Sequence, residues 1–225
     1  MLLAEELALL AVDPSTGRYG MGTRSLLNAA LAGLLVAELM LDGIAARGDR
    51  KGQVAVAPGR RPPTTAVLAA AAEVVVERGP KIKPVLSHMD RGLQSRLGYG
   101  TWEAAVVGLA EAGVVGPVSG GMRPSTELLD ARPRDEIVAR LQAAARSDDP
   151  MEPRTALLLN MAGPASLLEV VAPERRGRRH ARQRIDHGLD GTDFEDVGKA
   201  VRRVIADANA GAGATVAGGA VASSG

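Results

Sequence analysis

The sequence predicts a mainly α-helical protein, a single globular helical domain with two small β-hairpins. Apolar residues recur at helical spacing through most of the chain, and Gly, Pro and Asp residues separate these periodic segments. Short apolar runs around glycine-containing turns are confined to residues 44–57 and 114–128, which are expected to form the two hairpins. With 225 residues, the chain is long enough to bury a substantial core.

The N-terminal part is predicted to hold one short and one long helix. Residues 2–11 repeat leucine near the helical period, and the turn-rich loop 13–20 follows them. Thr23 or Ser25 is placed to cap a long helix that runs to Asp42. Apolar residues surround this helix on almost every side, so it is expected at the centre of the core.

The middle of the chain is predicted to add three helices between the two hairpins. Helical periodicity covers residues 64–78, and a short helix at 85–91 follows after two prolines, at 80 and 84. Thr101 is placed to cap the next helix, which Gly113 ends. The second hairpin comes directly after this helix and has a Gly-Gly pair near its tip.

The C-terminal part is predicted to be helical from Arg134 onward. Breaks at Pro, Gly and Asp divide it into helices at residues 135–146, 151–161, 164–171, 174–187 and 194–208. Residues 209–225 are uncharged and rich in Gly and Ala, which predicts a disordered tail. The chain is therefore divided into a helical domain at residues 1–208 and this tail.

Composition excludes several classes of function. The 27 Lys and Arg residues are balanced by 26 Asp and Glu residues, so any anion-binding role must come from local clustering. The chain has no cysteine, which excludes disulfides, thiolate zinc sites and cysteine nucleophiles. With two Tyr, one Trp and one Phe, it also lacks the stacking rings that single-strand nucleic-acid binders use.

Residues that carry enzyme chemistry form no recognisable pattern. The three histidines stand without a nucleophile motif, and no glycine-rich phosphate or dinucleotide loop occurs. Glu5 and Glu6 are expected on a solvated helix face. The acidic residues that follow His187 fit no metal-ligand spacing and are interpreted as a turn or a helix cap. We therefore expect no enzymatic activity, no cofactor and no metal.

The longest apolar run, residues 25–41, is slightly short of a membrane span and contains Asn28 and Glu38. The first ten residues carry two glutamates and no basic start, which is not the pattern of a secretory signal. The protein is therefore expected in the cytoplasm, where it can contact membranes only from outside.

Residues 101–129 combine a helix with a glycine-tipped hairpin, as do the last helix and wing of winged-helix DNA binders. A helix that recognises DNA needs Arg, Lys, Asn or Gln on its outer face. Here Glu103 and Glu111 would repel phosphates, and Arg123 is the one arginine of the hairpin. DNA binding is therefore the least favoured functional hypothesis, and no nucleic acid is expected as a partner.

The stretch "PERRGRRHARQR", residues 173–184, holds the densest positive charge. On a helix, Ala181, Ile185 and Leu189 would form an apolar stripe, and the arginines would occupy the remaining faces. Three interpretations stay open: a solvated face of a core-packed helix, a patch for anionic lipid, and a nucleic-acid contact. The candidate auxiliary basic patch comprises Arg175, Arg176, Arg178, Arg179 and Arg182.

Three segments together resemble the Golgi phosphoprotein 3 family, a group of eukaryotic Golgi adaptors with many bacterial relatives. They are "LLAEELALLAVDPSTG", "LAGLLVAELMLDGIA" and "EPRTALLLNMAGPASLLEVV", and they occur in the family's order. With "LAEAGVV" before the second hairpin, the resemblance covers residues 2–190. It implies a single, mainly α-helical domain, in agreement with the hydrophobic periodicity.

The resemblance also implies a peripheral membrane protein that binds phosphatidylinositol 4-phosphate in a basic pocket on one flat face. The family's pocket tryptophan falls near Thr23, one of its arginines falls on Ala32, and two more fall near Tyr99 and Trp102, without a match in identity. The candidate head-group residues of this chain are the nearest basic and aromatic side chains, Arg24, Arg91, Arg96 and Trp102.

The hairpin at residues 114–128 is implied by the resemblance to mediate oligomerisation or membrane contact. Because its apolar residues are few, we expect it to pair with another protomer through Val115, Val118 and Met122. The leading hypothesis is therefore a lipid-binding, peripheral membrane module for phosphatidylinositol 4-phosphate or another anionic phospholipid. The alternative is a protein-interaction scaffold of the same fold that binds no lipid.

Overall fold

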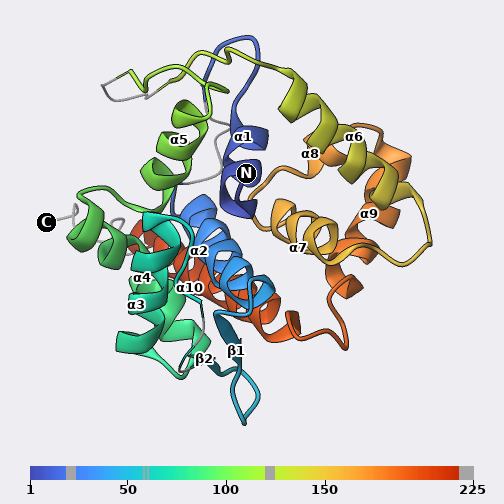
Figure 1. Cartoon of the computed structure of the whole chain (residues 1–225). Helices are drawn as coiled ribbons and strands as arrows, with labels where there is room; N and C mark the ends of the chain where they lie inside the picture. The colour runs from blue at the N-terminus through green and yellow to red at the C-terminus, as the bar shows by residue number, and fades with distance from the viewer. Residues whose placement is uncertain (19–23, 58, 60, 120–124, 218–225) are drawn as a thin grey trace, which may run out of the picture.

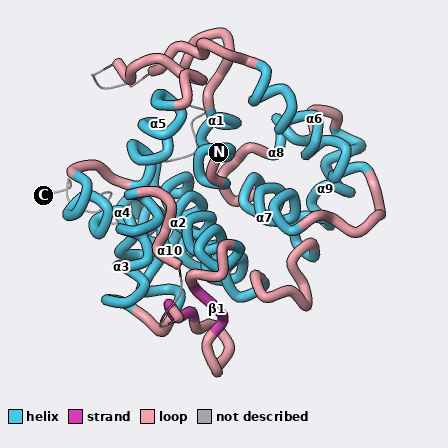
Figure 2. The backbone as a smooth tube through the Cα atoms, viewed as in Figure 1, coloured by secondary structure: helices cyan, strands magenta, loops and turns pink. Residues whose placement is uncertain are grey.

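The computed structural model describes residues 1–217 except for 19–23, 58, 60 and 120–124 (Figure 1). Within these residues, ten helices and one antiparallel pair of strands form the regular structure. Figure 2 shows the two strands at one edge of a body that is otherwise helices and loops. The predicted fold class, a mainly α-helical single domain, is confirmed.

The helices follow one another along the chain, and one hairpin interrupts them. The helices are α1 (Leu3–Ala11), α2 (Arg24–Leu41), α3 (Ala66–Arg78), α4 (Ile82–Leu97), α5 (Thr101–Glu111), α6 (Arg132–Arg146), α7 (Pro153–Ala162), α8 (Leu168–Val171), α9 (Arg175–His187) and α10 (Glu195–Ala217). Strands β1 (Ala45–Arg47) and β2 (Val54–Val56) pair antiparallel, with Ala46 opposite Ala55. This pair confirms the first predicted hairpin.

Helix α2 lies at the centre of the core, as its apolar pattern predicts. It contacts α1, α3, α4, α5, α7 and α10 (Figure 1). Leu31, Leu34 and Leu35 are each at most 1% exposed. Gly33 allows α10 to approach closely, because a Cβ at this position would lie 2.4 Å from Cγ2 of Val201. The packing of α2 therefore sets the positions of the helices around it.

Helix α4 is longer than predicted, since it spans Ile82–Leu97 rather than residues 85–91. The sequence predicts a break at Pro84, but this residue lies in the first turn of the helix, where its missing N–H costs no intrahelical hydrogen bond. Gly98 ends the helix with a φ of 83°. One continuous helix therefore carries both Arg91 and Arg96.

A neighbouring helix supplies the cap of α5. The N-cap residue is Gly100, which has no side chain to offer, and the predicted cap Thr101 is the first helical residue. Oδ1 of Asp90, in α4, accepts the N–H of Thr101 at 2.8 Å and a side-chain N–H of Asn28 at 3.2 Å. One carboxylate therefore joins α2, α4 and α5.

Helix α10 continues to Ala217, so the prediction that the last helix ends at residue 208 is wrong. Extending an existing helix costs far less than starting one, and alanine has the highest helix propensity. Residues 218–225 of the predicted tail lie outside the described residues. In contrast, α8 is shorter than predicted, because Ser166 has a φ of 63° and interrupts the helical backbone.

A buried ion cluster joins four helices. Nη1 of Arg154, in α7, donates to Glu38 of α2 at 2.6 Å, and Nη2 lies 3.3 Å from Glu6 of α1. Arg140 of α6 pairs with the second carboxylate oxygen of Glu6, and Glu38 also accepts the N–H of Leu3 at 2.8 Å. Glu6 is 6% exposed and Glu38 is 4% exposed. The expectation that Glu6 lies on a solvated face is therefore wrong.

The two carboxylates also hold Arg154 in its charged form. Burial lowers the pKa of Arg154, but the hydrogen bonds and charges of Glu38 and Glu6 outweigh burial and raise it. Arg154 therefore stays charged, and the buried carboxylates of Glu38 and Glu6 each have a cationic partner.

Replacing Arg154 by alanine should leave the buried carboxylate of Glu38 without its cation and leave Glu6 with Arg140 alone. We expect Arg154→Ala to lower the free energy of unfolding by about 3 kcal/mol, the low end for breaking a buried ion pair, because Arg154 is partly exposed. Urea denaturation followed by circular dichroism measures this loss. Arg146→Ala removes an exposed arginine of α6 and should cost less than about 0.5 kcal/mol. Equal losses of unfolding free energy in Arg154→Ala and Arg146→Ala would contradict the assignment of Arg154 as the partner of the buried carboxylates.

Candidate functional site

Helix α9 packs on the core through the predicted apolar stripe. Ala181, Ile185 and Leu189 are 0%, 5% and 3% exposed, respectively. The helix contacts α6, α7 and α8 with Ala181 and Ile185 facing inward, and Leu189 lies in the turn that follows it. The prediction of a core-packed helix in the arginine-rich stretch is therefore confirmed, and the arginines occupy its other faces.

Three arginines of α9 are directed to solvent. Arg175, Arg179 and Arg182 are exposed, and none of their side chains forms an ion pair or hydrogen bond with another residue of the described ranges. Because the apolar stripe holds the helix in place, these guanidinium groups are presented on a rigid support. We name Arg175, Arg179 and Arg182 the α9 arginine face.

The other two members of the predicted auxiliary patch differ from this face. Arg178 lies 2.9 Å from Glu169 and donates to the carbonyl oxygen of Ala172 at 3.1 Å, so its guanidinium holds α9 against α8. The side chain of Arg176 lies outside the described residues. The patch that the structure shows is therefore smaller than the sequence predicts.

Arg96, a predicted head-group residue on α4, has its guanidinium occupied within the protein. Nε donates to Glu73 at 2.7 Å, Nη2 donates to Glu77 at 2.9 Å, and Nη1 donates to the carbonyl oxygen of Gly92 at 3.0 Å. The hydrogen bonds to Glu77 and Glu73 raise the pKa of Arg96, and the hydrogen bond from Arg96 lowers the pKa of Glu77. A phosphate would have to compete with two carboxylates for this cation.

The other predicted head-group residues lie in three different settings. Trp102 is 6% exposed and belongs to the core, so its ring is not at the surface. Arg91 is exposed on α4. Arg24 is the first residue of α2, and its side chain lies outside the described residues.

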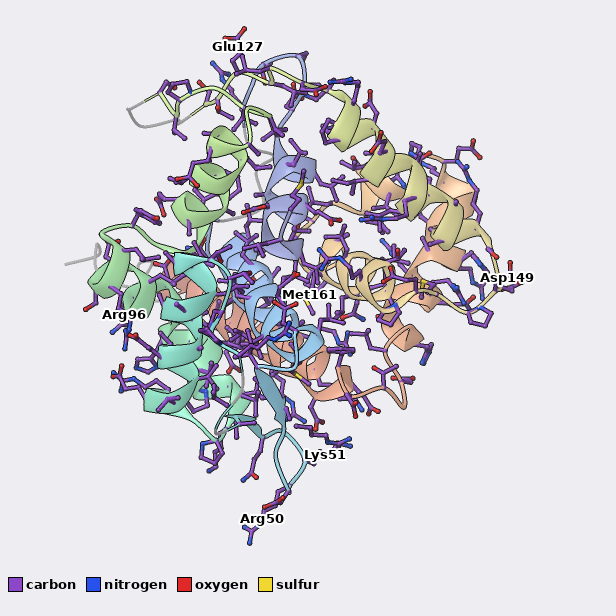
Figure 3. All side chains as sticks on the ribbon, in the orientation of Figure 1. Arg50, Lys51, Arg96, Glu127, Asp149 and Met161 are labelled. Atoms are coloured by element: carbon purple, nitrogen blue, oxygen red, sulfur yellow. The ribbon has the colours of Figure 1, made fainter. Side chains whose placement is uncertain are left out.

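The α9 arginine face and Arg96 do not lie on one surface. Arg184 of α9 donates to the carbonyl oxygen of Asp149 at 2.6 Å, and Figure 3 places Asp149 and Arg96 on opposite sides of the molecule. Helices α2 and α7 lie between these sides (Figure 1). The predicted basic residues therefore form separate groups rather than one flat face.

The second predicted hairpin is held by isolated bridges, Val115 with Leu128 and Ser119 with Ser125, rather than by extended strands. Val115 is 1% exposed and packs in the core of its own chain, so it is not available to a partner. Val118 is 43% exposed and is the member of the predicted oligomerisation set that faces solvent. Met122, the third member, lies outside the described residues.

The loop at residues 13–18 supports the base of this hairpin. Thr126 donates its N–H to the carbonyl oxygen of Gly17 at 2.9 Å, and Arg18 forms a bridge with Ser125. Gly17 has a φ of 62°, and a Cβ there would lie 2.2 Å from the carbonyl oxygen of Thr126. This contact therefore requires glycine.

Asp13 holds the same loop in its turn. Its Oδ1 accepts the N–H and hydroxyl of Ser15 at 2.9 and 2.6 Å, and those of Thr16 at 2.9 and 3.0 Å. The side-chain hydrogen bond from Ser15, followed by those from Thr16, lowers the pKa of Asp13 to about 2. The charged carboxylate is therefore part of the loop's structure.

The sequence patterns did not predict a further group of basic residues. All four lysines of the chain line one pocket beside the β1–β2 turn, together with Arg50 and Arg203. The lysines are Lys51, Lys81, Lys83 and Lys199. They come from distant parts of the chain, so no charge run marks them. The one available signal was the scarcity of lysine in an arginine-rich sequence.

The described ranges contain no helix that is both long and apolar enough to cross a membrane. Within the same ranges, no three His, Asp or Glu side chains gather as a set of metal ligands. Nδ1 of His187, the last residue of α9, lies 2.8 Å from Oδ2 of Asp190 in the turn that follows.

Comparison with known families extends over most of the chain. Residues 3–208 match the family model described as Golgi phosphoprotein 3 (GPP34). The matched range covers the three segments that carry the sequence resemblance except for Leu2, and it contains α1 to α9 and the first part of α10. The search among individually curated proteins finds no match.

Protonation of Asp13 should loosen the loop that supports the hairpin. Because its pKa is lowered from 3.8 to about 2, this carboxylate stabilises the folded state above about pH 4, and the contribution is lost as the pH falls toward 2. We expect Asp13→Asn to remove this part of the acid sensitivity in urea denaturation. An NMR titration should give a midpoint near 2 for the Asp13 carboxyl, and a midpoint near its ordinary value would contradict the assignment.

Proposed function

The chain belongs to the Golgi phosphoprotein 3 (GPP34) family, and we propose on that premise that it is a non-enzymatic peripheral membrane protein of the cytoplasm. Its ligand is the head group of phosphatidylinositol 4-phosphate or of another anionic phospholipid. The observation that carries the proposal is the α9 arginine face, which has no ion-pair partner among the described residues.

An anionic membrane is a suitable counterpart for this face. Each basic side chain close to such a surface contributes about 1 kcal/mol, and the attraction decays within a Debye length. The apolar stripe of α9 is buried, so the helix backbone is already ordered and binding carries no conformational-entropy cost for it. The three arginines would therefore give weak, salt-sensitive attachment, to which a head-group site adds specificity.

Recognition of one head group needs further contacts. Arg24 at the start of α2 and Arg91 on α4 are the candidates, because arginine binds phosphate through two parallel hydrogen bonds. Arg96 joins them only by releasing Glu73 and Glu77. Trp102 is buried and is not proposed as a lipid contact.

The second candidate function is a protein-interaction scaffold of the same fold. It is favoured by the ion pairs of Arg96 and by the burial of Trp102, which leave two of the four predicted head-group residues engaged inside the chain. In this alternative the arginines of α9 contact an acidic protein rather than lipid.

Liposome flotation tests the lipid proposal. The wild-type protein should float with liposomes that contain phosphatidylinositol 4-phosphate or phosphatidylserine, and not with phosphatidylcholine alone. We expect the charge-reversal variant Arg179→Glu/Arg182→Glu to lower the bound fraction about tenfold or more, because attraction becomes repulsion at two positions. The matched control Arg61→Glu/Arg78→Glu reverses two exposed arginines in other segments, the loop before α3 and the end of α3.

Three results of flotation have different meanings. A selective loss in the α9 variant supports attachment through the α9 arginine face. An equal loss in the control variant would assign binding to net charge. Failure of the wild type to float with any anionic liposome at moderate salt would reject the lipid proposal and favour the scaffold.

The hairpin is proposed to pair with a second copy of the chain. Val118 in the hairpin is 43% exposed and Leu129, directly after it, is 57% exposed; they are the exposed large apolar residues of this part of the described ranges. Val118→Ser/Leu129→Ser should reduce the molar mass measured by light scattering, because the apolar contact is lost. Val76→Ser alters an apolar residue of α3 that is 70% exposed and should have no effect. An unchanged mass in the hairpin variant would contradict the proposal.

A further inference from the structure

A pocket of about 630 Å³ lies between the β1–β2 turn, the start of α4 and the first turns of α10. Six basic side chains line it: Arg50, Lys51, Lys81, Lys83, Lys199 and Arg203. We name this site the lysine pocket, because it holds all four lysines of a chain with 23 arginines. Figure 3 shows Arg50 and Lys51 at the tip of the hairpin, far from Arg96.

Hydrogen bonds from backbone N–H groups connect the three segments that line the pocket. Gly52, in the β1–β2 turn, donates its N–H to Asp196 of α10 at 2.8 Å. The carbonyl oxygen of Gly52 accepts the N–H of Ile82, the first residue of α4, at 3.0 Å. Val54 also donates to the carbonyl oxygen of Pro80 at 2.7 Å. The basic side chains therefore extend from a connected backbone rather than from three independent segments.

The carboxylates near the pocket do not balance its positive charge. Asp196 lies 3.4 Å from Arg47, Lys83 lies 2.7 Å from Asp207, and Lys199 pairs with Glu195. Together with the lining residues, these groups amount to seven cations and three carboxylates. The lining cations without an ion pair to any described residue are Arg50, Lys51, Lys81 and Arg203.

The start of α4 adds to the positive potential. Lys81 is the N-cap residue, its side chain makes no capping hydrogen bond, and the first turn contains no acidic residue. The N-terminus of a helix carries partial positive charge, so Lys81 and Lys83 are placed where cations are disfavoured. A bound anion would relieve this repulsion.

A carboxylate at the edge of the pocket responds to the same potential. The hydrogen bond from Lys199, together with the N–H of Gly191 and the charges of Lys199 and Lys51, lowers the pKa of Glu195 to about 2. An anion that enters the pocket meets Lys51 and the three other lining cations that have no ion pair to a described residue. The potential therefore favours ligands with more than one negative charge.

We propose that the lysine pocket binds a terminal phosphate group, such as that of a phosphomonoester or a diphosphate, carried either by a soluble molecule or by a phospholipid head group. A phosphomonoester carries up to two negative charges and offers three terminal oxygens, which suits several unpaired cations better than a carboxylate or a phosphodiester does. Lysine fits this role as a flexible point charge on phosphate. The site is separate from the α9 arginine face and does not depend on it.

Isothermal titration calorimetry with inorganic pyrophosphate tests the soluble source, and vesicle sedimentation tests the lipid source. Vesicles with phosphatidic acid present a phosphomonoester, whereas vesicles with phosphatidylglycerol present a phosphodiester of the same sign. We expect Lys51→Ala/Lys81→Ala to weaken binding about tenfold, a difference of about 1.4 kcal/mol. Lys51→Arg/Lys81→Arg keeps the charge and should retain most of the affinity.

Arg61→Ala/Arg146→Ala removes two exposed cations outside the pocket and serves as the matched control. Lysine-dependent binding of pyrophosphate supports the pocket with a soluble ligand. Lysine-dependent preference for phosphatidic acid over phosphatidylglycerol supports it with a lipid head group. Absence of both, or an equal loss in the arginine control, overturns the proposal. Arg179→Glu/Arg182→Glu should leave pyrophosphate binding unchanged, so failure of α9 attachment and failure of the pocket are distinguishable.

Lysine acylation detected by mass spectrometry provides a direct second readout. Because the pocket contains every lysine of the chain, bound pyrophosphate should slow acylation of all four ε-amines. The α-amine of Met1, which lies outside the pocket lining, is the internal control. Equal rates with and without saturating pyrophosphate, and with and without phosphatidic acid vesicles, would overturn the proposal even if the alanine variant failed to fold.

Discussion

The arrangement of the helices depends on one buried ion cluster, in which Arg154 joins the carboxylates of Glu6 and Glu38. A buried carboxylate without a partner costs several kcal/mol, so α1 and α2 are stabilised in these positions by the cations that α7 and α6 supply. Glu38 also accepts the first backbone N–H of α1, from Leu3, which fixes the start of α1 against the last turn of α2. Because α2 is the helix around which most others pack, this cluster orients the whole domain.

Ion pairing within the chain separates the basic residues that stabilise the fold from those that are available to a ligand. Arg154 and Arg96 each bind two carboxylates, and Arg178 holds α9 against α8. Such cations are already compensated, so an anion gains little from them. The α9 arginine face and the lysine pocket retain unpaired cations in the described structure. Both proposals of anion binding rest on this difference and not on the number of arginines.

Much of the fold could be predicted because it depends on spacing along the chain. The central position of α2 and the inward stripe of α9 both follow from apolar residues at helical intervals. The wrong predictions of helix bounds and caps have physical causes that the spacing of apolar residues does not show. Pro84 lies in a first helical turn, where proline is tolerated, and the cap of α5 comes from Asp90 on another helix. Extension of α10 past residue 209 reflects the low cost of lengthening a formed helix.

The sequence by itself determined the mainly α-helical class, the family resemblance and the amphipathic character of α9. Each of these properties is set by residues that are near neighbours along one segment. The tertiary structure decided which side chains are available to a ligand: it buried Trp102, paired Arg96 with two glutamates, and brought Lys51, Lys81 and Lys199 to one pocket. Availability depends on what packs against a side chain, and those neighbours come from distant segments whose contacts form only when the core assembles.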